Sequence, residues 1–540
     1  MQKLKKVVTM ALSASLIAGM LAGCGGGGSA ANTSGNSSTS AETSTNQKIV
    51  QISYLACDRG NVPASEGTME DNWFTKWVNQ EASKDIGVSV KIIPVPNSQR
   101  EQILATRLAS GDAPDVCYST DYTNISNYTA NSGLTELTDL VDKYGVNIKK
   151  KIPAGYIDQL KVDGKLFAIP KYSQTLGAYT TWIRKDWLDK LGLKAPTDLE
   201  ELYNVLKQIK EKDPGNVGDK LIPFALPAIA NSSMMFIDQA ILPGFFKDAP
   251  SGEQLVQPYY FLPQAKEAVR FLNKLYSEKL MGEFIVDKDQ SQYKQKIVNG
   301  ELGATIHTAY FLYSATNPPL LDSLRKNVPD ANYTAAYPWK DPGAKENFYA
   351  FYQGGAGNQW RFYIPKSSKN PEAAFKFIDW MASDKFTEAI YFGINEGTDY
   401  KVADGMKVIA DDTAKSRISF VQPDYFGPLE LYSDNVNKYL KSYSSSWNPA
   451  YSAQFLSETV SGDKVDRFQT PVLSSARPAY DKYKGTLDKK WDEVLVKLVC
   501  STAPKDFDAA FDAAIKTLKA EGGDEVIKES TDLYKKQYGK

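Results

Sequence analysis

The sequence predicts an α/β fold, and three observations lead to this class. Short runs rich in β-branched and aromatic residues alternate with longer amphipathic runs, as expected when strands and helices alternate along a chain. The composition is that of a globular protein, with 42% hydrophobic and 24% charged residues. About 490 of the 540 residues follow position 47, which is enough chain for two or more domains.

The first expected elements follow one another closely. Residues 49–56 and 88–95 are rich in Val, Ile and Tyr and are expected to be strands. Apolar residues at helical spacing predict a helix over 99–110, and the sequence GDAP at 111–114 ends it. Residues 115–118 are then expected to form a short buried strand.

Later segments predict helices. Thr197 and Glu200 have the spacing of a capping box, and an apolar stripe follows them. Asn370 and Pro371 predict the start of another helix, because Asn is favoured at the N-cap and Pro in the first turn. A further amphipathic helix is expected over 507–518, and we find no internal repeat.

The amino-terminal segment predicts export. Three lysines precede an apolar stretch over 7–22, which has about the length of a signal-peptide core. Residues 21–24, LAGC, resemble the bacterial lipobox, and this resemblance implies cleavage after residue 23 and a lipid on Cys24. A plain secretory signal and an uncleaved anchor are the alternatives. Residues 25–47 hold no large apolar side chain, so we expect 24–47 to be a disordered tether that reaches roughly 25–30 Å.

Charge and residue usage exclude several classes of function. The chain has 63 basic and 64 acidic residues, and this balance lacks the basic surface that nucleic-acid binding needs. His307 is its one histidine, so a His-rich metal site is excluded, and a Ser-His-Asp triad would depend on it alone. The sequence holds no HExxH, CxxC or Walker A motif. We expect no cofactor.

The cysteines predict few cross-links. With Cys24 lipidated, Cys57, Cys117 and Cys500 remain, which is an odd number. We therefore expect buried thiols with at most one disulfide.

Five segments carry a resemblance to a known family. They follow one another in the order 109–116 (ASGDAPDV), 163–171 (DGKLFAIPK), 182–202 (WIRKDWLDKLGLKAPTDLEEL), 299–311 (NGELGATIHTAYF) and 370–383 (NPEAAFKFIDWMAS). In this order they resemble the extracellular solute-binding proteins of family 1, in particular the LplA-like lipoproteins of carbohydrate ABC importers.

The resemblance implies a two-lobed periplasmic-binding-protein-like fold of type II, with an interlobe cleft and a crossover hinge. The implied domains are a signal peptide (1–23), the tether (24–47), an N-terminal lobe (48–172 plus 361–415) and a C-terminal lobe (177–355 plus 416–540). It also implies a monomeric binder, not an enzyme, at the extracellular face of the membrane. Its expected partners are a carbohydrate ligand, in the form of an oligosaccharide, and the permease subunits of an ABC transporter.

The ligand site is expected at the carboxyl ends of strands. Asp58 follows the first strand, in a loop where relatives carry charged sugar ligands. Asp121 and Tyr122 follow PDVCYS, and Asp121 matches an aspartate that binds sugar hydroxyls in relatives. Tyr172 and Gln174 follow DGKLFAIP, where relatives carry a polar ligand residue.

Aromatic residues are expected to complete this site. His307 and Tyr310 follow the GATI strand, and Tyr310 takes the place of a stacking tryptophan in relatives. Trp182 is a further candidate, and Trp360, after GGAGNQ, is expected to form a wall of the second lobe. Each has a structural alternative, since Trp182 is equally compatible with a core strand position and His307 with a satisfied buried histidine.

Some relatives carry a calcium loop where this chain has KDPGNVGDKL, residues 212–221. Asp213, Asn216 and Asp219 are retained as oxygen donors, but the closing acidic residue is missing. We therefore expect no metal.

Three alternatives of function remain open at this point. The same fold binds peptides or other solutes, and a binder can serve a sensor kinase instead of a permease. A secreted carbohydrate-active hydrolase or lyase is the alternative of another class, and it would need two carboxylates across a bond.

Overall fold

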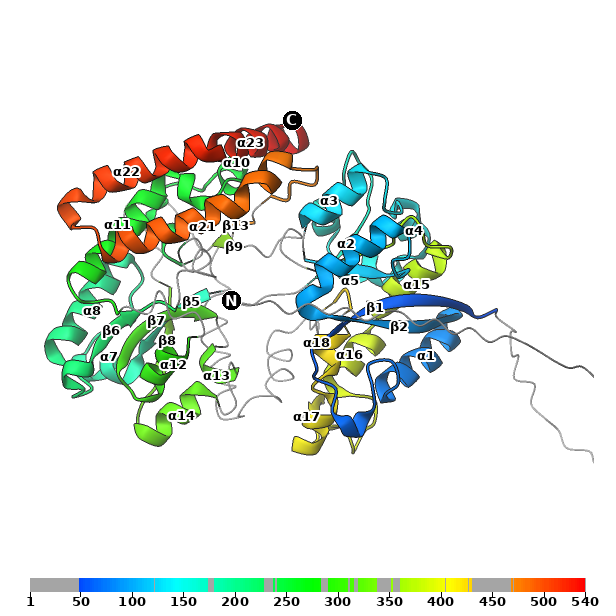
Figure 1. The fold of residues 1–540 in the computed structure, drawn as a ribbon. Coiled ribbons are helices and arrows are strands. Elements are labelled where there is room, and N and C mark those ends of the chain that lie inside the picture. Colours follow the sequence, from blue (N-terminus) through cyan, green and yellow to red (C-terminus); the bar gives the residue numbers. More distant parts are fainter. Residues whose placement is uncertain are drawn as a thin grey trace, which may run out of the picture. The chain divides into compact units, whose positions relative to one another are not determined.

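The computed structural model describes two lobes, each with its own hydrophobic core and sheet (Figure 1). The described residues are 48–120, 122–172, 179–227, 237, 240–282, 290–308, 311–314, 319–337, 351–352, 360–403, 405–425, 427–429, 468–469 and 471–539. In Figure 1 the first lobe holds the blue, cyan and yellow elements, and the second holds the green, orange and red ones.

The first lobe is built from two stretches of sequence. Its strands are β1 (Val50–Asp58), β2 (Val88–Pro96), β3 (Cys117–Ser119), β4 (Ile169–Pro170), β10 (Arg361–Tyr363), β11 (Tyr400–Ala403) and β12 (Met406–Ile409). Its helices are α1 (Trp73–Ile86), α2 (Arg100–Ser110), α3 (Tyr122–Ala130), α4 (Thr138–Tyr144), α5 (Val146–Lys151), α6 (Ala154–Asp158), α15 (Pro371–Met381), α16 (Asp384–Phe392), α17 (Asp412–Ile418) and α18 (Val421–Asp424).

The first-lobe strands run side by side in the order β2, β1, β3, β10 and β4. β1 and β2 are parallel over their whole length. Val116 joins β1 to β3, because the Leu55 amide donates to the Val116 carbonyl at 3.0 Å and the Val116 amide donates to the Ser53 carbonyl at 3.0 Å. β10 returns from late in the chain and lies antiparallel between β3 and β4. The carboxyl ends of β1 to β4 and the amino end of β10 therefore share one edge.

Burial explains why these segments become strands. Residues 54–57 of β1 are all buried, as expected for a strand covered on both faces. α1 and α2 lie on opposite sides of β1 and β2 (Figure 1). α15 begins after Asn370 as predicted, and it buries Phe377, Ile378 and Met381 in the same core.

The second lobe contains a four-stranded sheet and the C-terminal helices. Its strands are β5 (Tyr179–Arg184), β6 (Ile222–Ala225), β7 (Leu302–Thr308) and β8 (Tyr333–Ala336), in the order β6-β7-β5-β8. Its helices are α7 (Lys185–Leu191), α8 (Leu199–Lys212), α10 (Gly252–Leu255), α11 (Pro263–Ser277), α12 (Ser291–Val298), α13 (Phe311–Ser314), α14 (Leu320–Asn327), α21 (Pro478–Cys500), α22 (Phe507–Leu518) and α23 (Asp524–Tyr538). The short strands β9 (Phe351–Tyr352) and β13 (Phe468–Gln469) pair with each other.

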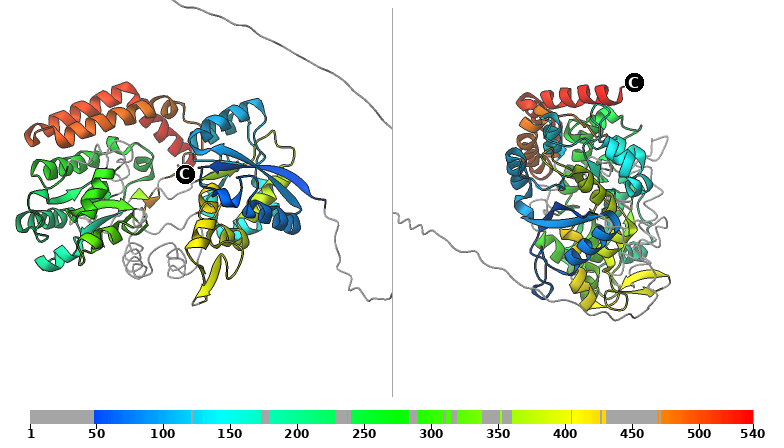
Figure 2. Two further views of the ribbon diagram at one scale, coloured as in Figure 1. Left: turned by 60° about the horizontal axis from the view of Figure 1, so that its bottom comes forward. Right: turned by 90° about the vertical axis from the view of Figure 1, so that its right-hand side faces the viewer.

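The C-terminal helices form a layer on α11. The buried Asn273 of α11 donates to the carbonyls of Leu498 and Thr502, both at 2.8 Å. Trp491 of α21 is fully buried and donates its ring N–H to the hydroxyl of Tyr259 at 2.7 Å. Figure 2 shows the long helices α21 and α22 of this layer from a second direction.

One predicted cap differs by one residue. α8 begins after Asp198, whose Oδ1 accepts the backbone N–H of Glu201 at 2.7 Å. Thr197 instead donates its hydroxyl to the carboxylate of Glu201 at 3.0 Å. The prediction of a Thr197 cap with Glu200 was wrong, because the aspartate next to it accepts the helix amide.

Among the described residues, membership of the hydrophobic cores changes from the first lobe to the second between Tyr172 and Trp182, back to the first between Tyr337 and Trp360, and to the second again between Val472 and Tyr480. Phe420, Val421, Tyr425 and Leu429 belong to the first core, although the predicted limit placed residues after 415 in the C-terminal lobe. The exact limits of the lobes stay a prediction.

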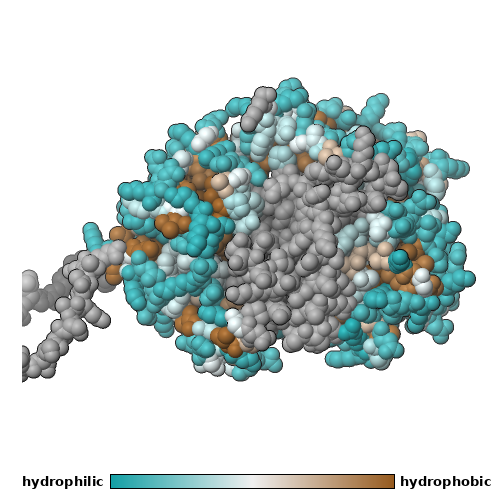
Figure 3. All heavy atoms as spheres, turned by 180° about the vertical axis from the view of Figure 1, so that it is seen from behind, coloured by the Kyte–Doolittle hydropathy of each residue, from teal (hydrophilic) through white to brown (hydrophobic). Residues whose placement is uncertain are grey.

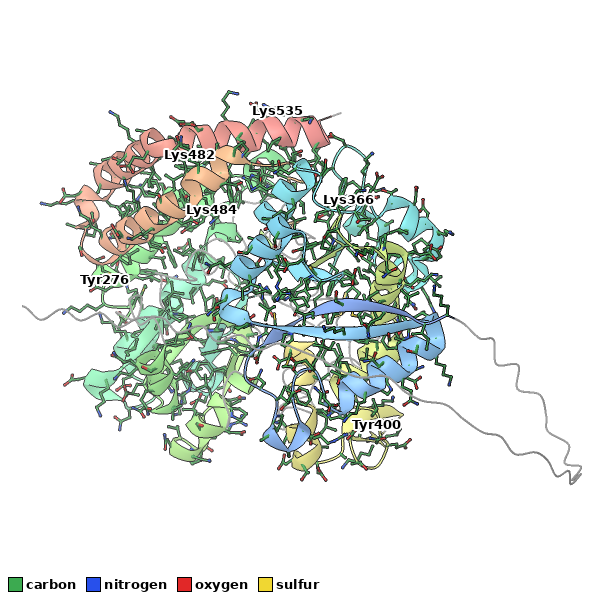
Figure 4. The ribbon with its side chains drawn as sticks, turned by 45° about the vertical axis from the view of Figure 1, so that its right-hand side comes forward. Tyr276, Lys366, Tyr400, Lys482, Lys484 and Lys535 are labelled. Carbon is green, nitrogen blue, oxygen red and sulfur yellow. The ribbon has the colours of Figure 1, made fainter. Side chains whose placement is uncertain are left out.

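Most of the described surface that Figure 3 presents is polar. The hairpin of β11 and β12 projects from the first lobe (Figure 2). Tyr400, labelled in Figure 4, is its first residue. The Lys407 ammonium lies 4.3 Å from the centroid of the Tyr400 ring. In the part of the chain that the structure describes, the helices are all too short or too polar to span a bilayer.

Candidate functional site

Polar and aromatic side chains gather at one edge of the first-lobe sheet. Each lies at the end of a strand or next to it. The group consists of Asp58, Arg59, Asn97, Ser119, Lys171, Tyr172 and Trp360. The pairing register fixes this arrangement, because Asp58 stands opposite Pro96 and Arg361 stands opposite both Ser119 and Pro170. In α/β sheets, ligands bind at the carboxyl ends of strands. We call these residues the strand-end group.

The loop after β1 is held by a carboxylate from far along the chain. Asp424 ends α18, and its side chain is fully buried. Its Oδ1 accepts from Arg59 Nη1 and from Asn61 Nδ2, both at 3.4 Å. Burial raises the pKa of Asp424 to about 6, and the nearby charge of Asp58 adds to this rise while Arg59 opposes it. Asp58 itself accepts the Gly60 amide at 2.8 Å.

A second set of contacts connects three strand ends. Asn97 Oδ1 accepts from Arg59 Nη2 at 3.2 Å and from Arg100 Nη1 at 2.9 Å. Arg100 also donates to Glu101 Oε1 from Nε at 3.0 Å and from Nη2 at 2.6 Å. Ser119 donates its hydroxyl to the other oxygen of Glu101 at 2.6 Å. Charge-assisted hydrogen bonds of this kind fix side-chain geometry, so the edge is preorganised.

Trp360 lies within this group and belongs to the first lobe. The guanidinium carbon of Arg100 lies 4.4 Å from its ring centroid, and the ring of Tyr118 meets it edge-on at 5.2 Å. Its carbonyl accepts the Lys171 amide at 2.6 Å. The expectation that Trp360 forms a wall of the second lobe was wrong, because the residue directly precedes β10, which pairs inside the first-lobe sheet.

Tyr172 is also placed beside this edge. Its amide donates to the Pro428 carbonyl at 2.8 Å, and its ring lies 5.2 Å from that of Tyr156 at 80°. The side chain is half-buried. Tyr172 therefore presents a partly accessible aromatic ring next to the point where the chain leaves β4.

Trp182 is a core residue of the second lobe. Only 1% of its surface is exposed, and it packs in a cluster with Phe311, Tyr293 and Leu302. A side chain buried to this degree has no surface for a ligand, so the structural alternative considered for Trp182 is the correct one.

His307 lies next to the last residue of β7 in the second-lobe sheet. It pairs in register with Thr180, and its ring stacks on Phe311 with centroids 3.5 Å apart. Burial lowers its pKa to about 3, with a smaller contribution from the charge of Lys294. The imidazole is therefore neutral at physiological pH, so it can donate or accept a hydrogen bond but cannot pair with an anion as a cation.

The neutral state of His307 gives a testable expectation. Replacement His307→Gln keeps a neutral polar side chain, so ligand affinity is expected to change with pH over 5–8 in the same way as in the wild type. Titration calorimetry at several pH values measures this. A pH dependence that disappears in the variant would show that His307 titrates in this range.

The predicted lipidation site and the remaining predicted ligand contacts lie outside the described residues. These are Cys24, Asp121, Gln174, Tyr310 and the side chain of Tyr122, whose backbone begins α3. Their roles stay predictions.

The calcium-like loop is closed by its own backbone. Asp213 Oδ1 accepts the Val217 amide at 2.9 Å, and Oδ2 accepts the Gly218 amide at 2.7 Å. Among the residues that the structure describes, no group of three or more His, Cys, Asp or Glu side chains is arranged to hold a metal ion. Cys57, Cys117 and Cys500 are not joined in disulfides.

Sequence reasoning missed Asn97, Arg100 and Asp424. The positions of Asn97 and Arg100 after the second strand gave a usable signal, because they follow a strand end as Asp58 does. The sequence around Asp424 gave no signal of a role in the site, because Asp424 lies 365 residues from Arg59 and is not part of a recognisable motif.

Comparison with known proteins agrees with this architecture. A family model described as "Bacterial extracellular solute-binding protein" matches residues 66–388. The chain is 26% identical over 475 residues to the polygalacturonan/rhamnogalacturonan-binding protein YtcQ of Bacillus subtilis (strain 168), covering 84% of this chain and 87% of that protein. It is 24% identical over 464 residues to the lipoprotein LipO of the same organism, with the same coverage of 84% and 87%.

A solved structure shows the same fold. The alginate-binding protein AlgQ2, solved without calcium ion, superposes with a TM-score of 0.60 at 21% identity, and the match covers 91% of this chain and 98% of that one. Since the family model matches more than half of the chain, this protein belongs to the bacterial extracellular solute-binding proteins, a family of binding proteins and not of enzymes.

Proposed function

We propose that this protein captures an oligosaccharide between its lobes and delivers it to the permease of an ABC transporter. The strand-end group carries the proposal, because it gathers carboxylate, amide, cationic and aromatic side chains at one sheet edge. Sugar rings have apolar faces that pack on aromatic rings and hydroxyl edges that bond to such polar groups.

Residues from both lobes would hold the ligand. Asp58, Asp121, Tyr122, Tyr172, Gln174 and Trp360 are the proposed contacts of the first lobe. His307 and Tyr310 are those of the second. A ligand that contacts both lobes favours a closed form, since only that form satisfies both sets of contacts.

Acidic oligosaccharides are the first ligands to test. YtcQ is named for polygalacturonan and AlgQ2 for alginate, and both polymers consist of uronic acids. The first-lobe edge carries Arg59, whose side chain is 23% exposed, whereas Arg100, Lys171 and Arg361 behind it are buried. Guanidinium groups bind carboxylates in two-point geometry, so they suit a uronate better than a neutral sugar.

A thermal-shift screen tests the proposed function. Because a ligand that binds only the folded state stabilises it by mass action, an oligogalacturonide or alginate oligomer is expected to raise the melting temperature. Fructo-oligosaccharides and N-glycan fragments test neutral sugars, and peptides test the alternative ligand class. A melting temperature that no carbohydrate raises would contradict the proposal.

Two site substitutions locate the ligand. Asp121→Ala and Tyr310→Ala each remove one proposed contact, and each is expected to weaken binding about tenfold, the cost of one hydrogen bond to a charged group or one aromatic contact. Titration calorimetry measures the loss. Unchanged affinity in both variants would refute the placement between the lobes.

The anchor is part of the proposal. We infer that Cys24 carries a lipid and that residues 24–47 tether the folded body to the outer face of the membrane. A relative is named a lipoprotein, and two or more acyl chains anchor a protein stably. Cys24→Ser is expected to abolish incorporation of labelled palmitate and to release the protein from the cell surface. Retention of the label in the variant would disprove lipidation at this position.

A further inference from the structure

We propose that Asp424 is a positioning residue of this ligand site, and that its protonation weakens ligand binding under mildly acidic conditions. The inference rests on the proposed function, because the site is the same. It adds a residue that is distant in sequence from every proposed ligand contact. It also adds control of ligand affinity by pH.

The geometry gives Asp424 this role. Its side chain is fully buried, and its Oδ1 is the acceptor shared by Arg59 and Asn61. These two residues flank Gly60 in the loop that carries Asp58 at the end of β1. Arg59 also reaches Asn97 at the end of β2. The ionised carboxylate therefore connects the loop to α18, and Arg59 connects the same loop to the end of β2.

The second oxygen of Asp424 sets it apart from the other buried acids around the first core. Oδ2 is buried and has no hydrogen-bond partner among the described residues. Asp399, by comparison, accepts from the amides of Ile394 and Asn395 and pairs with Arg417. A carboxylate that is buried with one oxygen unsatisfied pays a desolvation cost in its charged form. Asp424 is therefore held near the point where a proton neutralises it.

The charged groups around Asp424 agree with this reading. The loop after β1 supplies Arg59, which favours the ionised form, and Asp58, which opposes it; the neighbouring Tyr425 donates its hydroxyl to the Met69 carbonyl. The charged side chains of α16, which packs on α18, are paired elsewhere: Lys385 with Glu81 and Asp85, Glu388 with Lys407, and Asp384 with Lys151.

The sign of the pH effect follows from these contacts. Burial raises the pKa of Asp424 to about 6, so the group is ionised at pH 7.5 and largely protonated at pH 5. Protonation removes the charge that attracts Arg59 and frees the loop, so affinity falls as pH falls. His307 contributes nothing in this range, since its pKa lies at about 3.

Calorimetry with trigalacturonate at pH 7.5 and pH 5 tests the proposal. The wild type is expected to bind about tenfold more weakly at pH 5, the effect of losing one charge-assisted hydrogen bond. Asp424→Asn, which mimics the protonated acid, is expected to bind about tenfold more weakly at pH 7.5 and to lose the pH dependence. A variant that keeps the wild-type slope would overturn the proposal.

Asp379→Asn is the matched control. Asp379 is a second buried acid of the first lobe whose pKa is raised by burial, but it binds the amides of Asn147 and Ile148 at the start of α5. Its variant is expected to keep the wild-type affinity ratio between the two pH values. The same loss of slope in this control would show a general effect of first-lobe stability, and would overturn the assignment to Asp424.

Two measurements without ligand keep this inference separate from the proposed function. Trypsin at pH 7.5 is expected to cleave after Arg59 faster in Asp424→Asn than in the wild type, because the loop has lost its anchor. The stability that Asp424 contributes is present below the ordinary aspartate pKa of about 3.9 and is lost as pH rises through about 6. The melting temperature of the variant relative to the wild type is therefore expected to rise between pH 5 and pH 7.5.

The outcomes distinguish the two claims. If trigalacturonate and all other carbohydrates fail to bind, the proposed function fails, whereas faster cleavage and the relative melting shift still support Asp424 as the anchor of the loop. If a carbohydrate binds but cleavage after Arg59 is unchanged, the proposed function stands and this inference fails.

Discussion

Replacement of Trp360 by Ala is expected to weaken carbohydrate binding by about 30-fold, which corresponds to about 2 kcal/mol, the effect of truncating an aromatic side chain at the centre of a binding site. Trp360 is half-buried at the strand-end edge, and Arg100 covers its ring at 4.4 Å. The ring is thereby fixed in orientation before ligand arrives, and a sugar face gains its packing energy without ordering the side chain. Calorimetric titration of the variant measures the loss.

Trp77 provides the matched control for this experiment. It is a half-buried tryptophan of the same lobe on α1, with ring contacts to Phe74 and Trp380 at 5.8 Å. Trp77→Ala removes a comparable ring away from the strand ends, so it is expected to lower stability and leave affinity unchanged. Trp360→Phe keeps an aromatic face and is expected to retain most of the affinity. Equal loss of affinity in Trp77→Ala and Trp360→Ala would show that Trp360 acts through the fold alone.

Replacement of Trp182 by Ala is expected to lower the free energy of unfolding by about 3–5 kcal/mol, the range found when a large aromatic core residue is truncated. The side chain is 1% exposed in the central strand pair of the second-lobe sheet. Its removal leaves a cavity between β5 and the residues of α12 and α13 that pack on it. Denaturant unfolding followed by tryptophan fluorescence measures this loss.

The same variant separates core from ligand contact. At a temperature where Trp182→Ala remains folded, its affinity for oligosaccharide is expected to lie close to that of the wild type. A variant with wild-type stability but no binding would place Trp182 in the ligand site and contradict its assignment to the core.

The fold was predictable from local patterns. The apolar runs that became β1 and β2 and the apolar faces of α15 and α22 depend on residues within one element, and burial of one face follows from spacing alone. The position of Asp58 at a strand end followed from the same local reading. The structure confirms these elements with shifts of one or two residues.

The candidate site was predictable only in part, because its contacts join distant segments. Trp360 was expected in the second lobe, yet it precedes a strand that returns to the first-lobe sheet, and only the pairing of β10 with β3 and β4 reveals this. Asp424 reaches Arg59 across 365 residues. Trp182 and Trp360 have the same side chain, and the difference between core and edge depends on which neighbours the fold supplies.

The most direct test of the central claim is calorimetric titration of the purified protein with a defined oligosaccharide, followed by mass spectrometry of the sugar recovered from the complex. We expect saturable binding of one ligand per chain, about 30-fold weaker binding in Trp360→Ala, and a recovered sugar of unchanged mass. Absence of binding to every acidic and neutral oligosaccharide, or recovery of shortened sugar, would contradict it.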